Sequence, residues 1–118
     1  MKWSWNIIEK KVASLKNVTL AYSDNGIGNP IVLIHGFMGS RFYWEKVIPN
    51  LADEYRVIAI DLPGHGDSSN NHKDNHSIDD YADLVKELLD ELNISQTTMF
   101  GHSLGGYITL AFAEKYSQ

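Results

Sequence analysis

The stretch that decides the fold is "TTMFGHSLGGYITLAF", residues 97–112, in which a serine stands where an apolar strand gives way to a helix. Ser103 is the middle residue of a G-x-S-x-G pattern, flanked by Gly101 and Gly105. A Cβ at either glycine would crowd a sharp strand-to-helix turn, so the pattern predicts strained backbone angles at the serine. Such a turn lifts the hydroxyl out of the sheet at a helix N-terminus, where free N–H groups stabilise negative charge. The alternative is a plain turn with a capping serine.

The composition is that of one ordinary globular domain. The chain has 118 residues, of which 43% are hydrophobic and 21% charged, and it has no cysteine, which excludes disulfides and thiolate chemistry. The net charge of -5 argues against a nucleic-acid partner, because phosphate binding needs a basic face. His72 and His76 flank Asp74 in a polar loop that is either a weak metal site or, as we favour, a solvated loop. We expect no metal and no cofactor.

The N-terminal sequence "MKWSWNIIEKKVASL" lacks an apolar run of signal-peptide length, since Glu9, Lys10 and Lys11 interrupt it. No window of the chain approaches the roughly 18 apolar residues of a membrane span. We therefore expect a cytoplasmic protein that has no membrane partner.

Four segments carry strand patterns. Residues 17–22, "NVTLAY", alternate apolar and polar side chains and predict a half-buried strand, with turn chemistry in the "SDNGIGN" that follows. The continuous apolar runs "PIVLI" and "YRVIAI" predict strands buried on both faces, and "TTMFG" predicts a third such strand.

Helices are predicted after each of the three buried strands. The first is capped by Ser40 and is kinked or shortened by Pro49. The clearest begins after Ser77, and its apolar stripe consists of Ile78, Tyr81, Leu84, Val85, Leu88, Leu89 and Leu92. The last covers residues 104–116. This alternation predicts an α/β fold with a parallel sheet and helices on both faces.

In such sheets ligands bind at the carboxyl ends of the strands. The glycine-rich segments "HGFMGS", "DLPGHGDSS" and "GHSLGG" all begin at those ends and are expected to converge on one crevice. When a serine attacks an ester carbonyl, the oxygen becomes an anion that needs two preset N–H donors. The expected donors are the backbone N–H groups of Leu104 and Phe37. Gly36 allows close backbone approach, and His35 is expected to hold the loop by hydrogen bonds from a buried ring.

These three segments, in this order and spacing, resemble the N-terminal half of an α/β-hydrolase over residues 18–116. The resemblance implies the α/β-hydrolase fold, with residues 1–118 forming a partial domain that is truncated after the nucleophile helix. It implies an esterase-like serine hydrolase that acts on carboxylic esters or related small acyl substrates, with Ser103 as nucleophile and an acyl-enzyme intermediate. An aspartate at this position would mark dehalogenases or epoxide hydrolases. The motif residues are His35, Gly36, Gly101, His102, Gly105 and Gly106.

The resemblance also extends to a lyase of the menaquinone pathway that uses the same serine. Its substrate is polyanionic, so arginines in the pocket would favour it, and Arg41 is compatible with that reading. The expected pocket lining is Met38, Arg41, Phe42 and Tyr107. Tyr43 and Tyr107 are equally well explained as core residues.

The family's catalytic acid and histidine follow later strands, and this sequence stops at Gln118, before either. His65 is the best local candidate for a base, although its neighbouring glycines favour a structural turn. His102 and Glu114 are expected to point away from the serine. We therefore expect the isolated chain to be nearly inert, because a serine without its base is a weak nucleophile. A non-catalytic truncated product is the third reading, and an unpaired edge at "TTMFG" predicts self-association.

Overall fold

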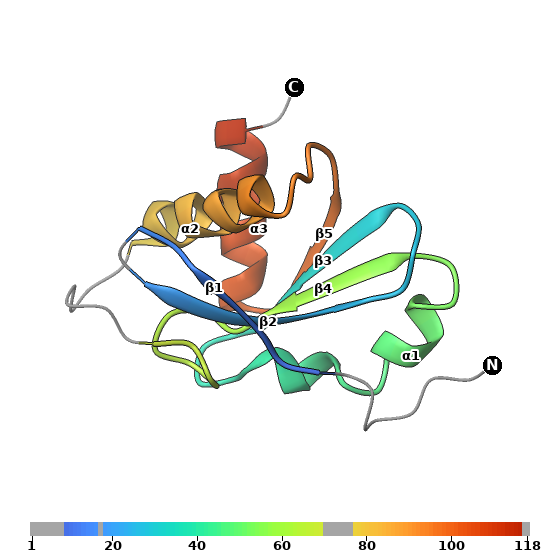
Figure 1. Cartoon of the computed structure of the whole chain (residues 1–118). Coiled ribbons are helices and arrows are strands. Elements are labelled where there is room, and N and C mark those ends of the chain that lie inside the picture. Colours follow the sequence, from blue (N-terminus) through green and yellow to red (C-terminus); the bar gives the residue numbers. More distant parts are fainter. Residues whose placement is uncertain (1–8, 17, 70–76, 117–118) are drawn as a thin grey trace.

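The described part of the chain, residues 9–16, 18–69 and 77–116 of the computed structural model, forms a five-stranded mixed sheet with helices on both faces (Figure 1). The strand order is β1-β2-β4-β3-β5. The strands are β1 (Lys11–Ser14), β2 (Thr19–Asn25), β3 (Pro30–Ile34), β4 (Arg56–Ile60) and β5 (Thr98–Gly101).

The parallel part of the sheet places the predicted loops at one edge. β3 lies between β4 and β5 and runs parallel to both, while β1 and β2 are antiparallel to their neighbours. Ile34 pairs with Ile60 on one side and with Gly101 on the other. Since these residues end their strands, the three following loops leave the sheet at the same level. The predicted parallel sheet is confirmed for these strands, and β1 is a strand that the sequence did not predict.

The burial of the strands follows their place in the sheet. β3 and β4 are buried on both faces, as their continuous β-branched runs predicted. β2 was predicted to be half-buried, which is wrong: Ala21 and Ser23 are buried as well as Leu20 and Tyr22, so both faces of this strand are covered. β5 was predicted to be an apolar strand with an unpaired edge in this chain, and the edge is confirmed for the described residues. The prediction that β5 is buried is wrong for them, since Phe100 is 50% exposed.

Two long helices, α2 (Ile78–Glu91) and α3 (Leu104–Tyr116), cover one face of the sheet, and the short α1 (Ile48–Leu51) covers the other (Figure 1). The single helix predicted after β3 is split into a 3-10 helix, η2 (Arg41–Trp44), and α1. Ser40 caps the first piece, since its Oγ accepts the Phe42 N–H at 3.2 Å. Pro49 lies in the first turn of α1, so the predicted shortening is confirmed.

The α2 helix begins with the predicted cap. Ser77 Oγ accepts the Asp80 N–H at 3.0 Å, and Asp80 Oδ2 accepts the Ser77 N–H at 3.0 Å, which completes a capping box. The predicted apolar stripe of α2 packs on the core, with two differences: Ile78 is exposed, and Ala82, which was not predicted in the stripe, is fully buried. No described helix is both long enough and apolar enough to cross a membrane.

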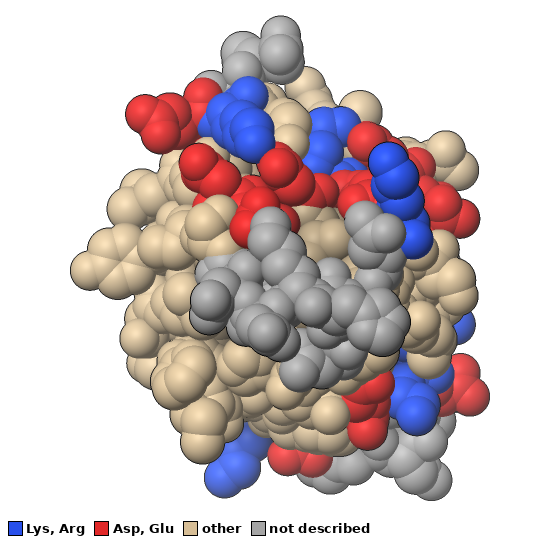
Figure 2. Space-filling model, turned by 90° about the vertical axis from the view of Figure 1, so that its left-hand side faces the viewer, with Lys and Arg blue, Asp and Glu red and all other residues tan. Residues whose placement is uncertain are grey.

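Charged side chains of both signs lie side by side on the face shown in Figure 2, with one group near the top and further ones near the bottom and lower right. Two ion pairs on the helical layer illustrate this mixing. Lys86 Nζ lies 2.5 Å from Asp90 Oδ1, and Lys115 Nζ lies 2.7 Å from Asp83 Oδ1. The described residues therefore form no extended basic surface on this face.

The open edge of β5 predicts self-association of the 118-residue chain. An unpaired strand offers N–H and C=O groups to a second copy, and a charge on such an edge opposes pairing. We expect light scattering to show oligomers of the unmodified chain and a shift toward monomer for Phe100→Lys. Ile27→Lys is the matched control, because Ile27 is also an exposed hydrophobic residue but lies in the turn between β2 and β3. A monodisperse monomer of the unmodified chain would contradict the prediction.

Candidate active site

The turn between β5 and α3 holds Ser103 with a φ of 57°, in the left-handed region that residues other than glycine seldom adopt. The serine carbonyl accepts the N–H groups of Gly106 at 2.8 Å and Tyr107 at 3.2 Å, so the helix starts directly at the serine. The side chain is exposed, and no described residue forms a hydrogen bond with its hydroxyl. The strained turn that the G-x-S-x-G pattern predicted is therefore present.

Two glycines make this turn possible. A Cβ on Gly105 would lie 2.2 Å from the Ile34 carbonyl oxygen, and a Cβ on Gly101 would lie 2.1 Å from the Gly105 carbonyl oxygen. Real Cβ atoms essentially never approach so closely, so both positions require glycine. Gly106, also predicted as a motif residue, is different, because the nearest atom to its added Cβ is 3.6 Å away.

The "HGFMGS" loop after β3 lies directly against the serine turn. A Cβ on Gly36 would be 3.2 Å from Ser103 Cβ and 3.1 Å from His102 Nδ1. The Gly39 N–H donates to the Gly36 carbonyl at 3.0 Å, and Met38 has a φ of 67°, which together are typical of a type II turn. The expected approach of these two loops is confirmed.

Both expected oxyanion donors have unused N–H groups. The Phe37 and Leu104 N–H groups donate to no described residue. Leu104 is the first residue of α3, where backbone N–H groups have no partner within the helix and the helix dipole favours negative charge. The two segments approach each other at Gly36, whose added Cβ would lie 3.2 Å from Ser103 Cβ.

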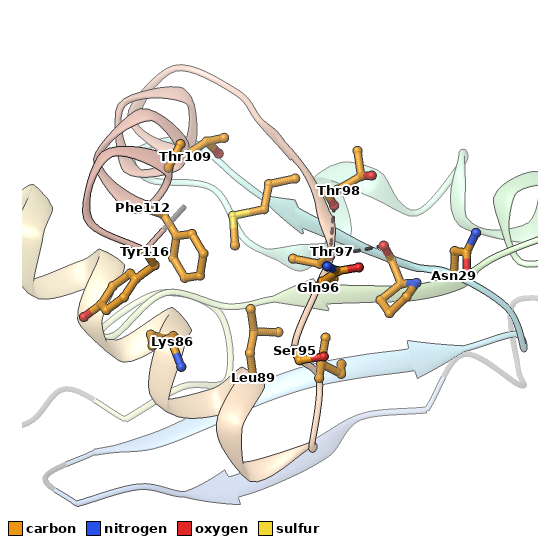
Figure 3. A pocket seen from close by; sticks show the side chains of 14 residues that line it. Asn29, Lys86, Leu89, Ser95, Gln96, Thr97, Thr98, Thr109, Phe112 and Tyr116 are labelled. Carbon is orange, nitrogen blue, oxygen red and sulfur yellow. Dashed lines mark hydrogen bonds between the residues drawn. The ribbon is translucent and has the colours of Figure 1, made fainter. Parts of the chain in front are cut away.

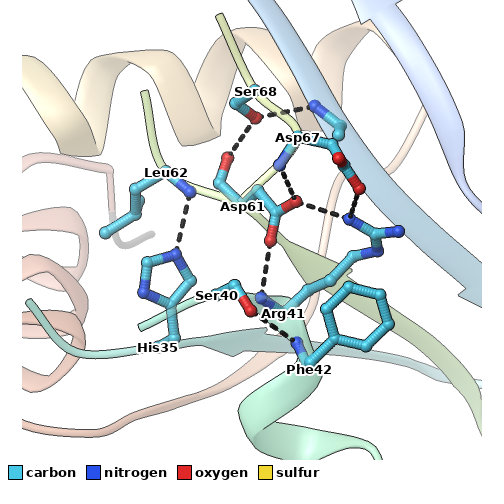
Figure 4. A network of polar contacts seen from close by, with 9 residues as sticks. His35, Ser40, Arg41, Phe42, Asp61, Leu62, Asp67 and Ser68 are labelled. Carbon is cyan, nitrogen blue, oxygen red and sulfur yellow. Dashed lines mark hydrogen bonds and ion pairs between the residues drawn. The ribbon is translucent and has the colours of Figure 1, made fainter. Parts of the chain in front are cut away.

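His35 is fully buried and ties the loop to the sheet (Figure 4). Its Nε2 lies 3.0 Å from the Leu62 N–H and must accept, so Nδ1 carries the proton and donates to the Gly36 carbonyl at 2.6 Å. Burial lowers the pKa of His35, and the neighbouring His65 lowers it further. The ring is therefore neutral, and the expected buried histidine that holds the loop is confirmed.

Arg41 was predicted to line the pocket, and the structure places it elsewhere. Its side chain is buried, and Nη1 lies 2.5 Å from Asp61 Oδ2 and 3.1 Å from Asp67 Oδ2 (Figure 4). The guanidinium thus forms ion pairs with two carboxylates of this chain. Asp61 is the residue that the sequence reasoning missed. The sequence feature that could have identified Asp61 is its place directly after a buried strand, at the carboxyl end where the loops meet.

The other predicted pocket residues belong to a set of exposed apolar side chains, here called the rim. The rim consists of Phe37, Met38, Phe42, Tyr43 and Tyr107. The Tyr43 ring stacks on the His102 ring at a centroid distance of 4.6 Å and an angle of 22°. The His102 ring thus packs against Tyr43, and it forms no hydrogen bond with Ser103.

The third loop also reaches the site. The His65 ring lies 5.1 Å from the His35 ring and 5.9 Å from the Phe37 ring, so all three glycine-rich segments converge as predicted. His65 Nδ1 lies 3.0 Å from the Pro63 carbonyl oxygen, a contact within its own turn. No hydrogen bond joins His65 to Ser103.

Two further features lie apart from the serine. A groove of about 910 Å³ runs between α2, α3 and the beginning of β5, with Met99, Phe112 and Tyr116 among its lining residues (Figure 3). It is at the opposite end of β5 from Ser103. The histidine loop predicted as a weak metal site, His72, Asp74 and His76, lies outside the described residues.

A strained serine at a strand-to-helix turn, with a glycine loop packed against it at the carboxyl edge of a parallel sheet, is the arrangement that the G-x-S-x-G pattern has in α/β-hydrolases. This arrangement defines the class of protein as an α/β-hydrolase. Residues 29–118 match the family described as alpha/beta hydrolase fold, and the chain belongs to this family.

Individual relatives agree with this assignment. The uncharacterized hydrolase YugF of Bacillus subtilis is 38% identical over 97 residues, which are 82% of this chain and 36% of that protein. The (E)-2-((N-methylformamido)methylene)succinate hydrolase of Acinetobacter baylyi is 35% identical over 103 residues, which are 87% of this chain and 39% of that protein. The solved structure of the N-acyl homoserine lactonase AidH with N-butanoyl homoserine superposes with a TM-score of 0.84 at 31% identity, over 92% of this chain and 41% of that one. The chain thus spans less than two fifths of the length of these curated relatives.

The two neighbouring glycines of the turn give a matched test of its packing. Gly105→Ala places a methyl group 2.2 Å from the Ile34 carbonyl oxygen, whereas the same change at Gly106 places it in ordinary van der Waals contact, 3.6 Å from the Gly101 carbonyl oxygen. We expect Gly105→Ala to lower the free energy of unfolding by about 1–3 kcal/mol or more, as overpacking does. Gly106→Ala is expected to stay within about 1 kcal/mol of the unmodified chain, since alanine favours helix. Urea unfolding followed by circular dichroism measures both, and equal effects would contradict the packing argument.

The neutral, buried His35 predicts a loss of stability in acid. The unfolded chain takes up this proton near the ordinary pKa of 6.5, whereas the folded chain takes it up only at lower pH. The contribution of His35 is therefore complete above pH 6.5 and is lost as the pH falls toward the lowered pKa. We expect up to about 1.4 kcal/mol of unfolding free energy per pH unit in this window. His35→Asn should flatten the slope, and an unchanged slope in that variant would show that other groups cause it.

Proposed function

We propose that this chain supplies the nucleophile and the oxyanion site of a serine hydrolase that cleaves carboxylic esters or related small acyl substrates. The observation that carries the proposal is Ser103, an exposed and strained serine at the N-terminus of the 13-residue α3 helix. Strained residues of this kind persist where the surrounding structure over-determines them, and they cluster at active sites. Gly101, Gly105 and Gly36 supply that surrounding structure.

In the proposed reaction, Ser103 Oγ attacks the carbonyl carbon and the carbonyl oxygen becomes an anion. The Phe37 and Leu104 N–H groups hold this anion, and its collapse breaks the bond to the alcohol and leaves an acyl-enzyme. Water then attacks the acyl-enzyme and releases the acid. The serine proton passes to a base on a segment outside the described residues, because no described side chain is hydrogen-bonded to the hydroxyl. This base gives the proton to the departing alcohol, then takes a proton from the attacking water and returns it to Ser103 Oγ as the acid leaves. The greater length of the relatives is consistent with such a segment.

The surroundings of Ser103 support an uncharged or weakly charged acyl substrate. The exposed rim of aromatic and methionine side chains offers apolar contact to an acyl group. The lactonase relative is named for an N-acyl substrate, and the Acinetobacter baylyi relative is named as a hydrolase. The pairing of Arg41 with Asp61 and Asp67 removes the cation that a lyase with a polyanionic substrate would use.

The proposal predicts that a serine-reactive fluorophosphonate labels the native protein, as purified from its source, at Ser103. Ser103→Ala should abolish the labelling and lower ester hydrolysis by a factor on the order of 10⁶, because the nucleophile is removed. Ser95→Ala is the matched control, since Ser95 is also exposed but lines the groove at the other end of β5. Intact-protein mass spectrometry and a p-nitrophenyl ester assay measure the two effects. Continued labelling of Ser103→Ala would refute the assignment.

A further inference from the structure

The loop that carries Phe37 is held at both ends by consecutive residues that follow β4. At its start, the Leu62 N–H donates to His35 Nε2 at 3.0 Å. At its end, the Arg41 backbone N–H donates to Asp61 Oδ1 at 2.6 Å. The turn with the unused Phe37 N–H lies between these two anchors. The position of that N–H group therefore depends on where β4 ends.

The Asp61 carboxylate is the most heavily bonded group in this region (Figure 4). It is fully buried and also accepts the Arg41 Nη1 donor at 2.5 Å and the Asp67 N–H at 2.8 Å. A Cβ on Gly66, which has a φ of 52°, would lie 2.4 Å from the carboxylate, so the following loop wraps closely around it. The main-chain carbonyl of Asp61 accepts a hydrogen bond from the Ser68 hydroxyl at 2.6 Å. A buried charge with these partners fixes their relative positions, since any displacement leaves it unpaired.

A second ion pair on β4 provides a comparison. Arg56, at the other end of the strand, forms two hydrogen bonds with Asp24, at 3.0 and 2.7 Å. This pair joins β4 to β2, is partly exposed, and contacts neither the Phe37 loop nor the serine turn. Sheet stability alone thus accounts for the Arg56 pair, whereas the Asp61 carboxylate bonds to the end of a loop whose remaining residues meet Ser103 at Gly36.

We propose that Asp61 is a positioning residue for the oxyanion site. Asp61 binds Arg41 directly through two hydrogen bonds. It also fixes the position of the next residue, Leu62, whose N–H donates to His35. Both ends of the loop are thereby held, so that the Phe37 N–H already points toward the anion. Donors in an oxyanion site act because they need no reorganisation during the reaction. The inference rests on the proposed function, since it assigns Asp61 a role in the same site, and Asp61 itself touches no reacting atom.

The test is Asp61→Asn in the native protein, with fluorophosphonate labelling resolved into its maximal rate and its half-saturating concentration. We expect the maximal rate to fall on the order of 10²-fold, as for loss of an oxyanion donor, while the half-saturating concentration changes by less than about threefold. Asp24→Asn is the matched control, because it breaks the other β4 ion pair and should change neither value. Circular dichroism confirms that each variant is folded.

Two results would overturn the inference: a folded Asp61→Asn variant with an unchanged maximal rate, or a loss confined to the half-saturating concentration. Should Asp61→Asn fail to fold, Arg41→Lys decides by the same two criteria, because it keeps the charge and the backbone N–H bond to Asp61. Its expected loss is about tenfold in the maximal rate, since lysine cannot reproduce the planar guanidinium geometry. Labelling that persists in Ser103→Ala would instead refute the proposed function itself, so the two failures are distinguishable.

Discussion

The close approach of α3 to the end of β3 is the contact on which the rest of the site depends. The Ile34 carbonyl accepts the His102 N–H at 3.1 Å, and a Cβ on Gly105 would lie 2.2 Å from the same oxygen. Only a residue without a side chain allows the helix to begin so near the sheet. Because the helix begins there, Ser103 must turn sharply with a positive φ, and its hydroxyl leaves the sheet at the helix N-terminus.

Two buried side chains, one neutral and one charged, hold the "HGFMGS" loop that lies against the serine turn. His35 is kept neutral by burial and uses one ring nitrogen as donor and the other as acceptor, which suits a bridge between two backbone groups. Asp61 is compensated by the Arg41 guanidinium and accepts from backbone N–H groups on both sides. A histidine can satisfy a carbonyl and an N–H together, whereas a carboxylate can only accept. Each group therefore matches the partners that its place in the loop provides.

Much of the fold and of the candidate site could be predicted from local patterns. The bounds of α3, the Ser77 cap of α2 and the strained turn at Ser103 all follow from residues within a few positions of each other. The convergence of the three loops follows from one general rule, that parallel strands end at a common edge. Membership of the α/β-hydrolase family follows from the order of the three motifs and agrees with the family match over residues 29–118.

The sequence by itself determined the elements, the caps and the serine turn, because helix and strand periodicity and the steric needs of glycine are local properties. Only the tertiary structure decided the burial of β2 on both faces, since burial of a face depends on what other parts of the chain pack against it. It also decided that Arg41 faces Asp61, a residue 20 positions away. That pairing arises from the register of β3 with β4, which brings the ends of the two strands level, and no local pattern specifies which charges then meet.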